Sequence, residues 1–305
     1  MYKITYFAGG CFWGMEKYFS CLNGVKDVIS GYANGISEST SYTKLKETDH
    51  VECIKIIYND YEISLEELLI RYFHIVNPYT LNKQGNDVGR QYRSGLYYEN
   101  DEDHKIIQKV YNYFESKSEE KYVVEVKKLQ HFIKAEEYHQ DYLDKNPLGY
   151  CHINWQSAYD ELDYPKRKYP MNELCRTILE ENNTERPFSS KYEKFDDKGI
   201  YVLRTNGMPL FSSEHKFDSG CGWPSFYKTI TANCLNYLND YSHNMIRTEI
   251  RSLDDHHLGH VFNDNPNDSG LRFCLNGAVL KFIPYDEMVK EGYELYQLFF
   301  RNEYK

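Results

Sequence analysis

The chain has 305 residues, of which 41% are apolar and 16% aromatic, so it can bury two cores of ordinary domain size and is not intrinsically disordered. Its formal net charge is −10 and no basic stripe is present, which argues against nucleic acid and anionic membranes as partners. No apolar run approaches the roughly 18 residues of a transmembrane helix, and the N-terminal residues alternate like a strand and lack the regions of a signal peptide, so we expect a cytoplasmic protein.

The first half of the chain alternates strand and helix patterns. A Gly-Gly turn at residues 9–10 separates the opening strand from a helical segment. Ser64 and Glu67 form a capping box ahead of apolar residues at helical spacing. This alternation predicts an α/β domain, built as an α+β layer, over residues 1–157. We expect strands over residues 1–7, 51–58 and 122–129, and helices over residues 11–22, 65–76 and 102–116.

The chain changes character after the first domain. Residues 158–169 are mostly charged, include a proline and show no apolar period, which predicts a linker. Strand and turn patterns dominate the rest, so we expect a mainly-β domain over residues 170–305. Within it we expect a short helix over residues 171–181 and strands over residues 199–204, 244–250 and 278–283.

Eight cysteines are spread over both halves, and no two of them form a Cys-x-x-Cys pair. In a reducing cytoplasm such cysteines are packing residues, metal ligands or reactive thiols more often than structural disulfides. A zinc site of four cysteines is therefore not expected. Four of the eight lie outside any motif and are interpreted as packing residues: Cys21, Cys53, Cys175 and Cys234.

The first reactive candidate is Cys11, in the sequence Gly-Gly-Cys-Phe-Trp-Gly-Met-Glu at residues 9–16. The pattern places the thiol at a helix N-terminus, where the helix dipole lowers a thiol pKa. The glycines allow a substrate to approach the backbone closely. The alternative, a cysteine buried in an apolar cluster with Phe12 and Trp13, is about equally compatible with the spacing alone.

Seven motifs in order resemble the type A methionine sulfoxide reductases over roughly residues 1–155. They include Gly-Cys-Phe-Trp-Gly at residues 10–14, His-Val-Glu at 50–52 and Gln-Gly-Asn-Asp-Val-Gly at 84–89. The others are Gln-Tyr-Arg-Ser at residues 91–94, Tyr-His-Gln-Asp-Tyr at 138–142 and Asn-Pro-Leu-Gly-Tyr-Cys at 146–151, with Gly-Tyr at 31–32 between the first two.

The resemblance implies a role for each matching residue. Cys11 is the nucleophile, Glu52 protonates the sulfoxide oxygen, and Cys151 resolves the resulting sulfenic acid as a disulfide. A carboxylic acid kept neutral in an aromatic pocket suits this role, because the sulfoxide oxygen leaves only when protonated. Five further residues bind substrate: Phe12 and Trp13 hold its methyl group, and Tyr42, Asp87 and Tyr92 complete the oxygen site. Tyr42 matches least well, because its flanking residues depart from the family pattern.

A second candidate site follows residue 200. Its motifs are Ser-Gly-Cys-Gly-Trp-Pro-Ser-Phe at residues 219–226, His-His-Leu-Gly-His at 256–260 and Leu-Arg-Phe-Cys-Leu-Asn at 271–276. From the residues alone two interpretations stand. His257, His260 and Cys274 are possible zinc ligands. Alternatively, Cys274 is a nucleophile whose thiolate Arg272 favours, with the histidines moving protons.

The same motifs, with Asn-Asn-Thr-Glu-Arg-Pro-Phe at residues 182–188, resemble the type B methionine sulfoxide reductases over roughly residues 170–305, which favours the nucleophile. The resemblance implies that Cys274 attacks, that Cys221 resolves, and that His257 and His260 bind and protonate the sulfoxide oxygen. No metal is expected, because the two Cys-x-x-Cys pairs that hold zinc in many type B enzymes are absent. The remaining roles implied are the methyl site for Trp223 and positioning for Asp264, Arg272 and Asn276.

Together the two resemblances imply one enzyme for both epimers of methionine sulfoxide, free or in oxidised proteins, with the S-epimer reduced by the first half and the R-epimer by the second. They imply no cofactor and thioredoxin as the external reductant, in a role of protein repair under oxidative stress. Two rival hypotheses remain: a peroxide-reducing thiol enzyme or redox sensor, and a zinc-binding interaction module.

Overall fold

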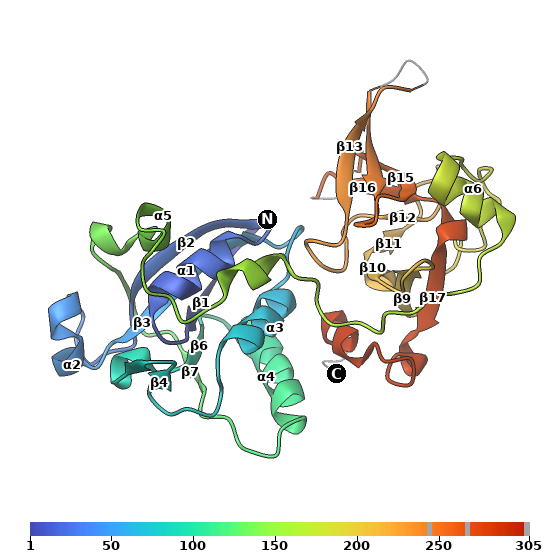
Figure 1. Cartoon of the computed structure of the whole chain (residues 1–305). Helices are drawn as coiled ribbons and strands as arrows, with labels where there is room; N and C mark the ends of the chain where they lie inside the picture. Colours follow the sequence, from blue (N-terminus) through green and yellow to red (C-terminus); the bar gives the residue numbers. More distant parts are fainter. Residues whose placement is uncertain (243–245, 266–268, 302–305) are drawn as a thin grey trace. The chain divides into compact units, whose positions relative to one another are not determined.

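The computed structural model of the chain describes residues 1–242, 246–265 and 269–301 (Figure 1). It divides into two compact units, residues 2–160 and residues 161–305. No cis peptide bond occurs among the described residues. Each unit has its own sheets and its own core, and each is described by itself below.

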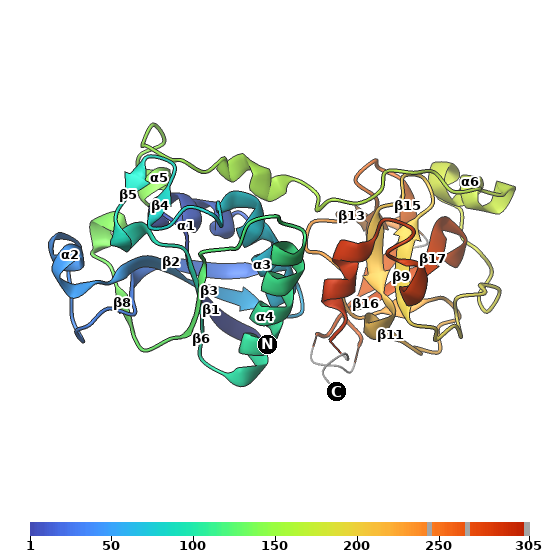
Figure 2. The same ribbon diagram turned by 90° about the horizontal axis from the view of Figure 1, so that it is seen from below.

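The first unit is built on a six-stranded sheet of order β7-β6-β1-β3-β2-β8 (Figure 2). Neighbouring strands are antiparallel except β6 and β7, which are parallel. The layered α+β organisation predicted from the sequence is confirmed, although the strands are mostly antiparallel. The strands are β1 (Tyr2–Ala8), β2 (Val25–Ala33), β3 (Val51–Asn59), β6 (Gly95–Tyr98), β7 (Glu125–Lys128) and β8 (Phe132–Lys134), and a two-stranded ribbon pairs β4 (Lys83–Gln84) with β5 (Asp87–Val88).

The alternation of β1 places its side chains on two faces of the sheet. The ring of Phe7 contacts Phe19 and Tyr72, which come from two helices. The ring of Tyr6 contacts Phe132 of β8 instead. Both faces of the sheet are therefore covered by apolar side chains. The buried sheet positions the residues at the ends of its strands. The helices are α1 (Phe12–Ser20), α2 (Leu45–Thr48), α3 (Leu65–Ile75), α4 (Asp101–Ser116) and α5 (Tyr142–Lys145).

The predicted cap of α3 is confirmed. The Ser64 Oγ accepts a hydrogen bond of 3.2 Å from the backbone N–H of Glu67, which satisfies one of the free donors at the helix start. The helix then buries an ion pair, in which the Nη2 of Arg71 lies 2.9 Å from the Oε1 of Glu67. Capping and burial together fix α3 against the sheet.

The second unit packs two antiparallel sheets around one core. The three-stranded sheet has the order β10-β9-β17, and the six-stranded sheet has the order β11-β12-β16-β15-β14-β13. Phe211 and Phe226 stack between them with ring centroids 4.4 Å apart. The predicted mainly-β class is confirmed. The elements are α6 (Glu173–Glu181), β9 (Gly199–Leu203), β10 (Pro209–Ser212), β11 (Lys216–Phe217), β12 (Ser225–Phe226), β13 (Asn236–Asp240), β14 (Arg247–Arg251), β15 (His257–Phe262), β16 (Arg272–Leu275) and β17 (Leu280–Pro284).

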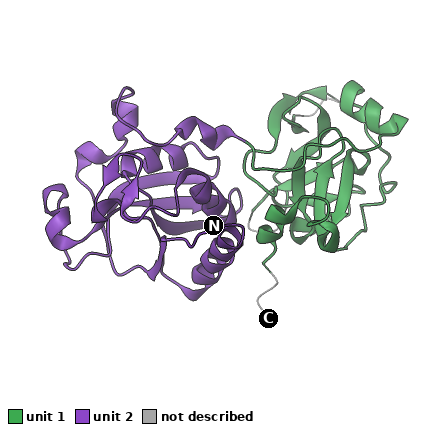
Figure 3. Cartoon of the chain, turned by 60° about the horizontal axis from the view of Figure 1, so that its bottom comes forward, with its two compact units in different colours: residues 1, 161–305 green, residues 2–160 purple. Residues whose placement is uncertain are grey.

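The segment expected to be a linker is anchored at several points. The division between the units falls between Asp160 and Glu161 (Figure 3). Within the first unit, the carbonyl of Ala158 accepts a hydrogen bond of 3.2 Å from Arg71. Within the second, the backbone N–H of Arg167 donates to the carbonyl of Asn206 at 2.9 Å. Hydrogen bonds therefore hold both ends of the charged segment 158–169. That these residues form a linker stays a prediction.

Three predicted strands need correction at their ends. The strand expected from residue 122 begins at Glu125, and the one expected from residue 278 begins at Leu280, after a 3-10 turn over Gly277–Val279. The strand expected over residues 244–250 is β14, which begins at Arg247; residues 244 and 245 lie outside the described residues.

Candidate active sites

Cys11 lies at the turn between β1 and α1. It is the N-cap residue of α1, with φ −63° and ψ 124°, and it is 9% exposed. Gly10 precedes it with φ 82°, and a Cβ there would lie 2.6 Å from the Cβ of Gln84, so the turn requires glycine. The thiol therefore sits at a helix start, in the position expected from the sequence.

The carboxyl of Glu52 is held beside this thiol. Glu52 lies on β3, is 1% exposed, and accepts a hydrogen bond of 3.1 Å from the backbone N–H of Phe12. Burial raises the pKa of Glu52 to about 8; the N–H of Phe12 opposes this shift, and the charge of Asp87 adds to it. The carboxyl is thus mostly protonated at neutral pH and can donate a proton.

The expected low pKa of Cys11 is wrong for this structure. Burial raises the pKa of the Cys11 thiol well above its usual range, and the negative charge of Glu52 raises it further. The helix N-terminus lowers the pKa of an exposed thiol, but here desolvation of the thiolate is the larger effect. Cys11 and Glu52 therefore both hold their protons at rest.

An aromatic group lies against the start of α1. The indole of Trp13 stacks on Tyr142 with centroids 3.6 Å apart, and its Nε1 donates to the Nδ1 of His139 at 3.2 Å. The ring of Phe12 lies 5.0 Å from that of His139. His139 and Tyr142 therefore fix the two aromatic residues expected to hold the methyl group. Their motif is part of the type A resemblance, but it gave no role for either residue.

The expected oxygen-binding residues come from three separate segments: Tyr42 and Tyr92 lie in two 3-10 turns, and Asp87 lies on β5. The hydroxyls of Tyr42 and Tyr92 share a hydrogen bond, and burial raises the pKa of both phenols. Both pKa values are also raised by the charges of Glu52 and Cys11, so the phenols lie within electrostatic range of these two groups. The carboxylate of Asp87 lies 3.5 Å from His152.

Cys151 lies against the first turn of α1. A Cβ added to Gly14 would lie 2.9 Å from the Sγ of Cys151, and the same Sγ donates to the carbonyl of Ile153 at 3.1 Å. Burial raises the pKa of Cys151. Because Gly14 is about one helical turn from Cys11, both thiols lie at the same end of α1.

The second candidate site is centred on Cys274 of β16. Its cross-strand neighbours are Ser225 on β12 and His260 on β15. The Sγ of Cys221 lies 3.5 Å from the Sγ of Cys274, and both side chains are half-buried free thiols. A disulfide needs about 2.05 Å between its sulfurs, so a small movement is enough to join them.

The two thiols of the second site share a proton unequally. Their mutual hydrogen bond lowers the pKa of Cys221 and raises that of Cys274 well above its usual range. Arg272 acts as expected by lowering the pKa of Cys274, but this effect is smaller than the hydrogen bond and burial. The hydrogen bond between the two thiols therefore favours a thiolate on Cys221 over one on Cys274.

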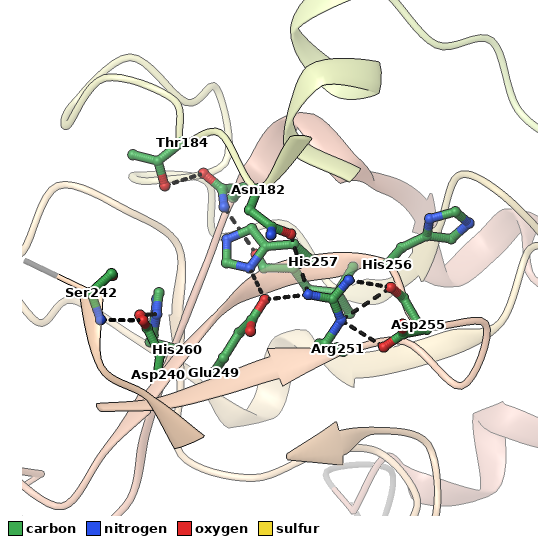
Figure 4. Close-up of polar contacts among 12 residues, drawn as sticks. Asn182, Thr184, Asp240, Ser242, Glu249, Arg251, Asp255, His256, His257 and His260 are labelled. Atoms are coloured by element: carbon green, nitrogen blue, oxygen red, sulfur yellow. Dashed lines mark hydrogen bonds and ion pairs between the residues drawn. The ribbon is translucent and has the colours of Figure 1, made fainter. Parts of the chain in front are cut away.

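Each of the two expected histidines is paired with a carboxylate (Figure 4). The Nδ1 of His257 lies 2.6 Å from the Oε1 of Glu249, and the Nε2 of His260 lies 2.8 Å from the Oδ2 of Asp240. A carboxylate partner fixes the ring orientation and tautomer of a histidine. Each carboxylate also pairs with an arginine, Arg251 for Glu249 and Arg247 for Asp240.

Trp223 and Asn276 are held by the backbone of Glu185, whereas Arg272 and Asp264 hold each other through their side chains. The indole of Trp223 donates to the carbonyl of Glu185 at 3.1 Å, and the Oδ1 of Asn276 accepts from the N–H of Glu185 at 3.0 Å. Arg272 and Asp264 form two hydrogen bonds of 2.6 and 2.8 Å. Glu185 belongs to the type B resemblance without an assigned role, yet it joins the methyl site to Asn276.

These groups surround a pocket of about 400 Å³. Cys274, Trp223 and the two histidines line it, together with the carboxylates that hold the histidines. Asp264, Arg272 and Cys221 are not among its lining residues. The pocket thus combines a thiol, an indole face and two proton-carrying rings.

The four cysteines expected to be packing residues differ in exposure. Cys53, Cys175 and Cys234 are at most 1% exposed, and Cys21 is half-buried.

Within residues 1–242, 246–265 and 269–301, no three His, Cys, Asp or Glu side chains are grouped so that they could hold a metal ion. In the same part of the chain, no helix is both long and apolar enough to cross a membrane.

A family model described as peptide methionine sulfoxide reductase matches residues 3–169, more than half of the chain. The chain belongs to the peptide methionine sulfoxide reductases. A second model, described as the SelR domain, matches residues 171–284. Both families are methionine sulfoxide reductases, so this peptide methionine sulfoxide reductase is an oxidoreductase with two fused reductase domains that together act on both epimers.

Solved structures similar to this peptide methionine sulfoxide reductase include Mxr1 from Saccharomyces cerevisiae in reduced form. It is 41% identical, with a TM-score of 0.47, and the match covers 49% of this chain and 88% of that one. Methionine sulfoxide reductase A of Corynebacterium diphtheriae is 30% identical, with a TM-score of 0.47 and coverage of 49% and 77%. Mxr1 in complex with Trx2 is 31% identical, with a TM-score of 0.34 and coverage of 46% and 84%.

Proposed function

We propose that residues 1–157 reduce the S-epimer of methionine sulfoxide through Cys11, and that residues 170–305 reduce the R-epimer through Cys274. The observation that carries the proposal is that each half brings together a thiol, a proton-carrying group and a second thiol. In the first half these are Cys11, Glu52 and Cys151; in the second half the proton carriers are histidines.

In the first half, the sulfur of Cys11 attacks the sulfoxide sulfur while Glu52 protonates the sulfoxide oxygen. Glu52 then takes up the proton lost by the thiol, so the carboxyl is regenerated. The hydroxyl group then moves from the substrate sulfur to the Cys11 sulfur, the bond between the two sulfurs breaks, methionine leaves, and Cys11 becomes a sulfenic acid. Cys151 attacks that sulfur, water leaves, and a disulfide forms. The raised pKa of Glu52 supports this role, because it keeps the proton available at neutral pH.

In the second half, Cys274 attacks in the same way within the pocket lined by Trp223. His257 and His260 bind and protonate the oxygen, each oriented by its carboxylate. Cys221 then closes the disulfide from 3.5 Å. The aromatic wall favours a methyl thioether over a peroxide, which has no methyl group to bind.

We further propose thioredoxin as the reductant and the cytoplasm as the place of action. Each disulfide needs a dithiol to reopen it, and a cytoplasmic dithiol pool meets that need. One similar solved structure is described as Mxr1 in complex with Trx2. No cofactor and no metal enters either half-reaction as proposed.

The test is turnover of the separated epimers, each in a short peptide, with reduced thioredoxin. We expect both epimers to be consumed, one thioredoxin oxidised per methionine formed, and little consumption of hydrogen peroxide. Failure to reduce one epimer would remove the proposal for that half, and faster peroxide than sulfoxide turnover would favour the peroxide enzyme.

Glu185→Ala is expected to lower kcat/KM for the R-epimer about tenfold, because the loss of hydrogen bonds to a charged group displaces the residues they hold. The carboxylate of Glu185 accepts hydrogen bonds from the N–H groups of Gly277 and Ala278, and its backbone holds Trp223 and Asn276. Steady-state kinetics with each epimer measure the effect. The S-epimer is the internal control, and the exposed Glu180→Ala on α6 is the control variant; equal losses for both epimers would indicate misfolding instead.

A further inference from the structure

Two serine side chains surround the sulfur of Cys221. The Oγ of Ser219 donates to this sulfur at 3.0 Å, and the Oγ of Ser225 lies 3.4 Å from it. The two hydroxyls also share a hydrogen bond of 2.7 Å. Ser225 is 1% exposed and is the cross-strand neighbour of Cys274. The cluster therefore joins the loop that carries Cys221 to the strand that carries Cys274.

Hydroxyl groups that donate hydrogen bonds to a cysteine sulfur change the balance between its thiol and its thiolate. A thiol is a weak acceptor, whereas a thiolate accepts charge-assisted hydrogen bonds, so donors aimed at a sulfur stabilise its thiolate. The thiolate is the form that attacks a second sulfur. A half-buried thiolate without donors would be destabilised by desolvation.

We propose that Ser219 and Ser225 are positioning residues that keep Cys221 as a thiolate and aim it at Cys274 after the sulfoxide has been reduced. This inference rests on the proposed function, because it assigns the second thiol of the R-epimer site. It adds a role for two serines that take no part in substrate binding or in the first step.

The step that they assist is the closing of the disulfide. The Cys221 thiolate attacks the sulfur of the Cys274 sulfenic acid, a sulfur–sulfur bond forms, and the sulfur–oxygen bond breaks. The hydroxide that leaves takes a proton from solvent and becomes water. The thiolate sulfur is oxidised and the sulfenic sulfur is reduced, so the electrons balance within the pair.

Other titratable and charged groups lie on the elements around Cys221. Arg272 and Cys274 lie on β16, His260 lies beside Cys274 on β15, and Asp264 neutralises much of the Arg272 charge through its two hydrogen bonds. Asp218 precedes the loop, where its carboxylate accepts from the N–H of Gly220. Donation from Ser219 therefore adds to the field of Arg272, which acts on both thiols, and Ser225 holds the Ser219 hydroxyl through their shared hydrogen bond.

The experiment uses the full chain carrying Cys11→Ser, so that only the second site reacts. Rapid mixing with one equivalent of the R-epimer measures the burst of methionine, and loss of free thiols measures disulfide closure, from pH 5.5 to 9.5. For Ser219→Ala and Ser225→Ala we expect an unchanged burst. At pH 6.5 we expect closure to be about tenfold slower, with a dimedone-trapped sulfenic acid on Cys274.

The pH profile separates the proposed role from a structural one. The slower closure should disappear near pH 9, where an ordinary thiol ionises without help, and Ser219→Thr should restore the wild-type profile. Ser189→Ala, whose hydroxyl donates to the carbonyl of Arg186, is the matched control. A loss of the same size at every pH, or no loss, would overturn the inference. A missing burst in the parent chain would instead refute the proposed function.

Discussion

Cys11→Ser is expected to reduce turnover of the S-epimer by at least about 10⁴-fold and to leave turnover of the R-epimer unchanged. Cys274→Ser is expected to do the reverse. A serine hydroxyl at either position is a far weaker nucleophile toward sulfoxide sulfur, and it cannot form a sulfenic acid. Because each variant retains one working half, the untouched epimer reports on folding in the same sample.

The measurement is methionine formation from each separated epimer with saturating thioredoxin. Cys21→Ser is the control, because Cys21 is half-buried and lies outside both sites. Loss of both epimers in either variant would mean that the halves do not react independently. Retention of both would show that the nucleophiles are wrongly assigned, and peroxide consumption and zinc content would then be measured.

Glu52→Gln is expected to lower kcat/KM for the S-epimer by roughly 10²- to 10⁴-fold, the usual contribution of a general acid. The pKa of Glu52 is raised to about 8, so the wild-type carboxyl is protonated and active below that pH. Activity toward the S-epimer should therefore fall as the pH rises through about 8. The variant should lack that decline, because an amide does not titrate.

The raised pKa of Glu52 also predicts how the stability of the folded chain changes with pH. The folded chain keeps the Glu52 proton up to about pH 8, whereas the unfolded chain releases it near the ordinary pKa of a glutamic acid. The free energy of unfolding should therefore decrease between those two values as the pH rises, and it should decrease less in Glu52→Gln. Urea unfolding at several pH values measures this difference. An identical pH dependence in both proteins would contradict the assignment of the raised pKa to Glu52.

Local signals in the sequence predicted much of the fold. The capping residue Ser64 and the apolar spacing after it placed α3, and the Gly-Gly turn placed α1. The strand β2, over Val25–Ala33, was not predicted, because lysine, aspartate, serine and glycine interrupt its apolar pattern. It is nevertheless a central strand, which it becomes by pairing with β3 and β8. Such pairing depends on residues far away in the sequence.

The sequence also predicted only part of each candidate site. Motifs predicted which residues approach each thiol, but not what holds them. Glu249 reaches His257 from the adjacent strand β14, and Asp240 reaches His260 from β13, which lies beyond β14 in the sheet. Nothing in their own sequence context distinguishes these two acidic residues from solvated ones. The pKa of Cys11 also depends on burial by distant chain segments, so its helix position predicted the wrong direction.

The hydrogen bond from the N–H of Phe12 to Glu52 has a consequence for how the first site can vary. The carboxyl is held by the backbone of the residue that directly follows Cys11, and no side chain in the described part of the chain donates a hydrogen bond to it. Acid and nucleophile are thus spaced by the peptide unit itself. Replacing the ring at position 12 would reshape the wall that is proposed to hold the methyl group, and it would leave this spacing in place. Substrate range and proton delivery can therefore evolve separately at this end of the helix.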